Sequence, residues 1–243
     1  DQISGEIVWK AGDRRSSYAS PVRATIAEID QVIVVNEDFL TSHRASDGQI
    51  LWEHPWPGRS DTNASASQPV PVGNDQIFIY KGYGIGSELI QVSRDADGWE
   101  ADTVWKKNVL KTKMCNVVIR DGYVYGIDDV HLACIELTTG KKQWKKRRRP
   151  TFGHGQMMLV GEHLLVVSEE GEVILAAADP EEYTELGSFQ ALEGITWNNP
   201  ALSVPHLLVR NAEWAACYKL PVDEQDTTET QDPNRPSEVT PKQ

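Results

Sequence analysis

Cysteine is scarce in this chain: 3 residues in 243 are too few for a disulfide framework. Two of them, Cys134 and Cys217, take the same place in two copies of a repeated segment described below. That repetition favours small core residues over paired or reactive thiols. We therefore expect both side chains to be buried.

Positive charge is also in short supply. Lys and Arg number 24 against 36 Asp and Glu, which gives a net charge of −12. Because a nucleic-acid-binding protein needs basic surface to neutralise phosphates, the composition argues against nucleic acid as a partner. Part of the acid excess lies in the segment 221–243, which is poor in apolar residues and is predicted to be a disordered acidic tail.

Long apolar runs are absent. No stretch approaches the roughly 20 apolar residues of a membrane-spanning helix, so the sequence predicts no transmembrane segment. It shows no signal peptide and no initiating Met. Because the chain opens in the middle of a repeated motif, we expect it to be a fragment of a longer protein.

Recognisable catalytic patterns are missing as well. None of the 6 histidines has metal-ligand spacing, and no Ser-His-Asp or Cys-His signature is found. The segment 95–100 resembles a calcium loop only superficially, because its glycine is fourth where an EF-hand needs it sixth. The glycines of the segment 82–86 precede a strand-like run, not the helix that a dinucleotide loop opens. We predict no catalytic residues and no metal ligands.

The chain does contain a motif that recurs about every 40–50 residues: a turn ending in glycine, a short β-rich run, then a tryptophan. A fifth copy, which matches the motif less well, spans residues 185–189. Each unit opens at a second aligned position with a small or amide polar residue. The repeated tryptophans are Trp9, Trp52, Trp105 and Trp144, and the opening residues are Ser20, Gln68, Asn116, Gln156 and Asn199.

A period of this size with four strand-like runs per unit predicts an all-β fold, a β-propeller of four-stranded antiparallel blades. Residues 1–220 form the propeller, and residues 1–10 are expected to be a lone outer strand. No segment has a helical period. The units are 18–54, 66–107, 114–147, 154–191 and 197–220, the last with three strands.

The repeated tryptophans have a predicted structural role. Each lies on an outer strand, where a large ring can pack between adjacent blades and contribute a large buried area. Trp9, Trp52, Trp105 and Trp144 are therefore expected to dock one blade on the next. The glycine that precedes the tryptophan permits a positive φ in the hairpin turn.

The recurring glycine–tryptophan motifs resemble the repeat of the pyrroloquinoline-quinone-type bacterial propellers, Ala-x-Asp-x-x-Thr-Gly-x-x-x-Trp. Thr139, Gly140 and Trp144 fit it, with Cys134 at the Ala place and Glu136 at the Asp place. The resemblance implies a propeller of seven or eight blades, of which this chain would be somewhat over half. It implies a periplasmic, secreted or envelope location. Members include quinoprotein dehydrogenases and the protein-binding propeller lipoprotein of the outer-membrane β-barrel assembly machinery.

The residues that open the units form the candidate site. Symmetry sets them as a ring near one mouth of the central channel, with Tyr18, Met114 and Trp197 as apolar walls. Alternatively, the amides satisfy backbone groups at the crowded axis. The candidate ligand-binding residues are Ser20, Gln68, Asn116, His154, Gln156 and Asn199.

The basic run 145–149 stands out in an acidic chain. It is either a solvated linker or a patch for acidic protein, anionic polysaccharide or lipid headgroups. We expect replacement of Lys146 or Arg148 to change stability little, because exposed charges contribute little.

These observations predict a non-catalytic scaffold that binds a protein, a ligand or another envelope component and needs no cofactor. The alternative is an alcohol or sugar dehydrogenase that uses pyrroloquinoline quinone with calcium at the channel mouth. The sequence lacks the adjacent Cys-Cys pair that a resemblance to the alcohol-oxidising members would imply.

Overall fold

Strands make up the regular structure throughout the residues that the computed structural model describes, 1–221, and no helix occurs among them. From residue 222 onward the predicted acidic tail lies outside the described residues. The first two sheets comprise β1 (Val22–Ile26), β2 (Ile29–Val35), β3 (Phe39–Arg44) and β4 (Ile50–Pro55), then β5 (Val70–Val72), β6 (Gln76–Lys81), β7 (Gly86–Arg94) and β8 (Trp99–Lys107).

The third and fourth sheets repeat this pattern, and the fifth has three strands. The third comprises β9 (Val118–Arg120), β10 (Tyr123–Asp128), β11 (His131–Glu136) and β12 (Lys142–Lys146). The fourth comprises β13 (Gln156–Val160), β14 (His163–Val167), β15 (Glu172–Ala177) and β16 (Glu185–Gln190), and the fifth β17 (Ala201–Ser203), β18 (His206–Arg210) and β19 (Ala215–Lys219).

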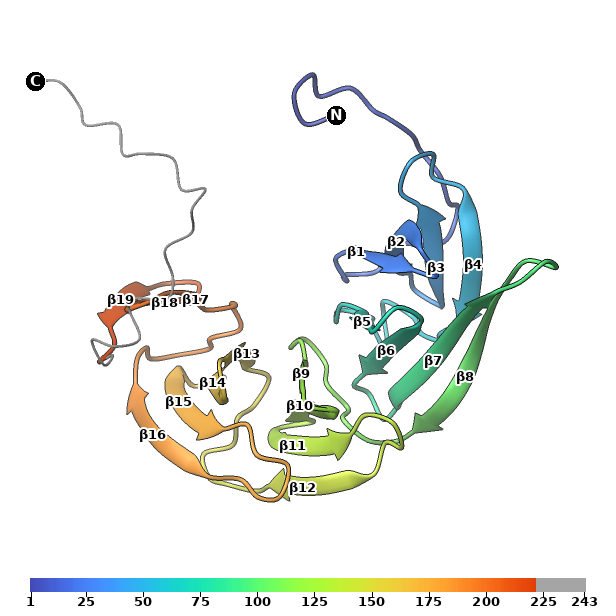
Figure 1. The fold of residues 1–243 in the computed structure, drawn as a ribbon. Coiled ribbons are helices and arrows are strands. Elements are labelled where there is room, and N and C mark those ends of the chain that lie inside the picture. Colours follow the sequence, from blue (N-terminus) through green and yellow to red (C-terminus); the bar gives the residue numbers. More distant parts are fainter. Residues whose placement is uncertain (222–243) are drawn as a thin grey trace, which may run out of the picture.

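Each sheet is an antiparallel meander in chain order, which confirms the predicted all-β blades. The five sheets follow one another around an arc, with β1, β5, β9, β13 and β17 inside and β4, β8, β12 and β16 outside (Figure 1). The first and last sheets stand at the two ends of the arc and share no strand pairing. The arc is thus open in this structure.

Burial along the strands follows from face-to-face stacking of the blades. In the middle blades, β6, β10 and β14 are buried on both faces, so their apolar residues run without alternation. In the last blade, β18 alternates between buried and exposed residues because one face is uncovered. Four apolar clusters, mostly between neighbouring blades, make up the core.

A β-bulge recurs between the third and fourth strands of the four complete blades. In three of them it lies next to the repeated tryptophan, where Trp52 faces Ser42, Trp105 faces Leu89 and Trp144 faces Cys134. A bulge adds one residue to a strand and increases its local twist. Its position turns the outer strand just where the indole meets the next blade.

The tryptophans contact the following blade through the same hydrogen bond in three of four copies. The indole Nε1 donates to a backbone carbonyl at 2.9 Å, from Trp9 to Ala45, from Trp105 to Leu137 and from Trp144 to Asp179. The next repeat's glycine fits below the ring. A Cβ added at Gly48 or Gly140 would come within 2.5 or 2.8 Å of the Trp9 or Trp105 ring.

Trp52 departs from this pattern. Its Nε1 donates to Oε1 of Gln31 in its own blade at 2.9 Å, although the ring still packs into the cluster between the first and second blades. The cause is the long β7–β8 hairpin. Gly98 lies at its tip with nothing near its Cβ position, so it offers no docking place to Trp52.

Two sequence expectations are wrong. Residues 1–10 form no strand, because no strand among residues 1–221 pairs with them; within this segment Trp9 docks, with its ring 6.1 Å from that of His43. Cys217 is exposed, unlike buried Cys134, because β19 belongs to the blade whose face is uncovered.

Candidate functional site

The loops of the blades gather on two opposite faces, because successive strands run in opposite directions. We call one of them the connector face. It carries the links between blades, the approach to β1, and the turns between the second and third strands of each blade. Its residues are 17–21, 36–38, 56–69, 82–85, 108–117, 129–130, 147–155, 168–171, 191–200 and 211–214.

Three of the six candidate ring residues, Gln68, Asn116 and Gln156, lie where the inner strands begin at the connector face. Their side chains make hydrogen bonds between neighbouring blades. The backbone N–H of Gln68 donates to Oδ1 of Asn116 at 3.2 Å, and Nδ2 of Asn116 donates to Oε1 of Gln68 at 3.1 Å. The buried Gln156 donates from Nε2 to the carbonyls of Met114 and Trp197 at 3.1 and 2.9 Å. The structure therefore brings these three amides together as links between blades.

The other three ring residues are placed differently. Ser20 and Asn199 are exposed at the two ends of the arc. The half-buried His154 donates its backbone N–H to Oε2 of Glu169 at 3.2 Å. Because Gln68, Asn116 and Gln156 are already hydrogen-bonded, few polar groups remain free where the inner strands begin.

Exposed aromatic rings concentrate on the connector face. Among residues 1–221, the aromatic side chains with the largest exposure are Tyr18, Tyr83, Trp197 and Trp214, at 71%, 44%, 46% and 64%. All four belong to the connector face, and Met114 and Ile195 add exposed apolar surface there. Aromatic residues on a surface are the side chains most enriched at the centres of protein interfaces.

The sequence indicated Tyr18, Met114 and Trp197 as wall residues but not Tyr83 or Trp214. Both lie in turns between second and third strands, and Tyr83 has φ +58° between two glycines. Nζ of Lys113 lies 5.3 Å from the centre of the Tyr83 ring, so this turn contacts the link to the next blade. A large aromatic residue in a tight turn, where turn-forming residues are the rule, is the signal that would have identified both.

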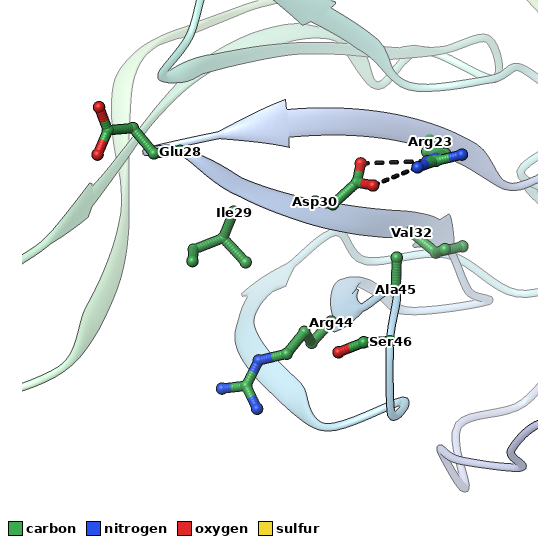
Figure 2. A pocket seen from close by; sticks show the side chains of 8 residues that line it. All are labelled: Arg23, Glu28, Ile29, Asp30, Val32, Arg44, Ala45 and Ser46. Atoms are coloured by element: carbon green, nitrogen blue, oxygen red, sulfur yellow. Dashed lines mark hydrogen bonds and ion pairs between the residues drawn. The ribbon is translucent and has the colours of Figure 1, made fainter.

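A hollow of about 600 Å³ lies on the opposite face, in the first blade (Figure 2). Its charges are paired within the chain. Arg23 bonds both carboxylate oxygens of Asp30, as the dashed lines in Figure 2 show, and Arg44 donates from Nη1 to Asp47 at 2.8 Å. Since its cations are already neutralised, we do not assign a ligand to this hollow.

A buried ionic cluster joins the first two blades. Nε2 of His54 on β4 lies 2.8 Å from Oε1 of Glu88 on β7, and its Nδ1 lies 3.0 Å from the carbonyl of Ala101. Nζ of Lys106 lies 2.8 Å from Oε2 of Glu88. Burial lowers the pKa of His54, but the bonds to Glu88 and Ala101 outweigh it, so the pKa is raised. Since both ring nitrogens face acceptors, the cluster favours the imidazolium.

Pyrroloquinoline quinone with calcium would need oxygen donors and a catalytic carboxylate near the channel mouth. Within residues 1–221, no group of three or more His, Cys, Asp and Glu side chains lies close enough to hold a metal ion. Gln68, Asn116 and Gln156 are already bonded to each other or to backbone. The described residues thus do not form a fitting site for this cofactor pair.

Comparison with known proteins identifies relatives of the fold. A sequence model of the family described as outer membrane protein assembly factor BamB matches residues 1–146. The solved structure of BamB from Moraxella catarrhalis is 15% identical with a TM-score of 0.59; the match covers 88% of this chain and 62% of that one. No curated protein matches the sequence.

A second similar structure is described as a candidate 6-phosphogluconolactonase from Bacteroides uniformis. It is 13% identical with a TM-score of 0.58, over 81% of this chain and 65% of that one. The chain therefore spans less than two thirds of the length of either structure. Identities this low show a shared propeller fold and not a shared activity. None of residues 1–221 forms a helix long and apolar enough to cross a membrane.

Proposed function

The chain belongs to the family of the outer membrane protein assembly factor BamB, and we propose that it is a non-catalytic scaffold that docks another protein in the bacterial envelope. The single observation that carries this proposal is the gathering of Tyr18, Tyr83, Trp197 and Trp214 on the connector face. Family membership supports a scaffold role, and the name of the family supports a partner in outer-membrane protein assembly.

The arrangement suits docking for two physical reasons. Tyr and Trp supply a large contact area at low conformational-entropy cost, since each has only two side-chain torsions. The loops that carry them are tied to the blades, for example by Nε1 of Trp197, which donates to Oε1 of Glu169 at 2.7 Å, and by Asn211, which accepts from the N–H of Trp214 at 2.8 Å. A pre-organised surface loses less entropy when a partner binds.

Site-specific photo-crosslinking in the native host tests this proposal. A photoreactive phenylalanine analogue replaces Tyr83 or Trp197 on the connector face, and Leu186, an exposed residue of β16, in the control. We expect a crosslink to one envelope protein from both connector-face positions and none from Leu186. Equal crosslinking from all three positions, or none from Tyr83 and Trp197, would contradict docking through this face.

The dehydrogenase alternative has its own test. The purified protein is incubated with pyrroloquinoline quinone and calcium, and quinone absorption and dye-coupled oxidation of alcohols and sugars are measured. The scaffold proposal expects neither bound quinone nor turnover. Bound quinone together with turnover would replace it with the enzyme.

A further inference from the structure

The basic run forms one wall of a hollow on the connector face. The link between β12 and β13 passes over the turn that leads into β11, and together they enclose about 540 Å³. The fully buried Phe152 fixes this link: its N–H donates to the carbonyl of Val130 at 3.1 Å, and its own carbonyl accepts from Glu169 at 3.0 Å. The hollow is lined by Val130, His131, Arg147, Arg148, Arg149 and Thr151.

Arg148 is held in place from the next blade, which corrects the expectation of an exposed side chain. Its Nη2 donates to both carboxylate oxygens of Glu172, at 3.0 and 2.8 Å, and the two side chains are only 15% and 16% exposed. The guanidinium carbon lies 5.2 Å from the centre of the Phe152 ring. The Arg148 side chain is thereby fixed at the hollow.

Two residues that line the hollow carry a polar atom without a partner. Nη1 of Arg148 and Nδ1 of His131 are closed to solvent and have no hydrogen-bond partner among residues 1–221. Arg147 and Arg149 are exposed, and within the described residues neither lies within ion-pair distance of a carboxylate. Buried polar groups are normally bonded, so a small side-chain movement that opens either atom to the hollow would let it bond a ligand there.

The local charge is positive although the chain is acidic. Of the three arginines that line the hollow, only Arg148 is paired, with Glu172, which leaves two positive charges unbalanced among the described residues. The nearby Lys111 and Lys145 pair with Asp128 and Asp129. Burial, with the charges of Lys145 and Arg147, lowers the pKa of His131. A neutral imidazole can donate or accept at Nδ1 without adding charge.

We propose that this hollow binds a phosphate group. Three arginines, His131 and Thr151 line it, and arginine side chains are the ones best suited to hold the oxygens of a phosphate. Two unbalanced positive charges suit a phosphate anion, and they balance the dianion of a phosphate monoester more fully than the single charge of a lipid phosphodiester. The group can belong to a soluble phosphate compound or to a phospholipid headgroup. This inference does not depend on the proposed protein docking.

The test uses the whole chain and three probes: inorganic phosphate, glycerol 3-phosphate, and phosphatidylcholine vesicles with or without phosphatidylglycerol. Binding is followed by the His131 ring-proton NMR signals, assigned with H131N. The site variant is R147Q/R149Q, and the matched control K141Q/K142Q removes the same charge from exposed residues of the opposite face. Because charge-assisted hydrogen bonds are the strong ones, we expect phosphate binding to weaken by about tenfold or more in the site variant and to stay unchanged in the control.

The three probes distinguish a soluble phosphate compound from a phospholipid headgroup. Vesicle binding that needs phosphatidylglycerol, Arg147 and Arg149 indicates a headgroup; binding of soluble phosphate without vesicle binding indicates a soluble ligand. Both support the proposal. No shift of the His131 signals with any probe, or equal weakening in both double variants, overturns it. Binding of an oligoglutamate peptide without phosphate binding also overturns it, in favour of an acidic protein. Circular dichroism of each variant confirms that it is folded.

Discussion

At the scale of single residues, the contact between a tryptophan and the glycine of the next repeat joins one blade to another. Gly140 has φ +63°, and the Trp105 ring lies where a Cβ would be, so this position restricts both backbone and volume. Gly122 has φ +80° with open space around its Cβ position. The pair allows backbone strain and ring contact to be separated.

We expect G140A to destabilise the protein more than G122A. Each variant places a Cβ in the left-handed region at ~1–3 kcal/mol, and only G140A also displaces the Trp105 ring. Urea unfolding of both variants measures the difference. Equal losses in the free energy of unfolding would show that the ring contact contributes nothing.

The tryptophan itself is tested by W144A. Trp144 packs against Tyr125 of its own blade and Tyr183 of the next, with ring centres 6.0 and 5.9 Å apart. Loss of burial and the resulting cavity should lower the free energy of unfolding by ~3–5 kcal/mol. K142A, an exposed change two residues away, should alter it little. An unchanged melting temperature for W144A would refute the docking role.

At the scale of strands and blades, the contact between β4 and the β7–β8 hairpin depends on a buried charge. The raised pKa of His54 means that folding favours its protonated form. Its contribution to stability is complete below the unfolded pKa of about 6.5 and is lost as pH rises through the folded pKa. The stability difference between the wild type and H54Q should therefore shrink with rising pH.

Urea midpoints of the wild type and H54Q from about pH 5 to about pH 9 check this. Burial and the nearby Lys106 lower the pKa of Lys81 to about 8. Stability therefore rises as pH increases above that value, and it does so equally in the wild type and in H54Q. H206Q, which replaces an exposed histidine of β18, is the control variant. A constant difference for H54Q would contradict a charged His54.

The blades were predictable from the sequence because they rest on local patterns: turn glycines, β-branched runs and a tryptophan at fixed spacing. The contacts of Trp52 were not, because Gln31 and the long β7–β8 hairpin lie in different parts of the chain. The partners of Gln156 are backbone carbonyls more than 40 residues away, at Met114 and Trp197, and backbone carbonyls carry no sequence signal. The free groups around Arg148 likewise depend on Glu172 in the following blade.

At the scale of the whole molecule, each blade packs only on its neighbours, so stability should vary along the arc. A chain of repeats with nearest-neighbour contacts opens most easily where a repeat has one neighbour instead of two. β10 of the third blade is buried on both faces, whereas β18 of the fifth exposes alternate residues, among them Leu208 at 45%. The two strands have the same place in their blades, which makes them a matched pair.

We therefore expect native-state hydrogen exchange to be faster for the amides of β18 than for those of β10. Both strands are hydrogen-bonded on both edges, β18 to β17 and β19 and β10 to β9 and β11, so strand pairing alone would protect them alike. Among the described residues, β18 differs from β10 in its uncovered face and in the absence of a fourth strand from its sheet. Exchange measured at increasing sub-denaturing urea should show β18 opening first and β10 opening with the global unfolding. Equal protection would mean that the arc unfolds as one cooperative unit and that stacking between blades does not limit its stability.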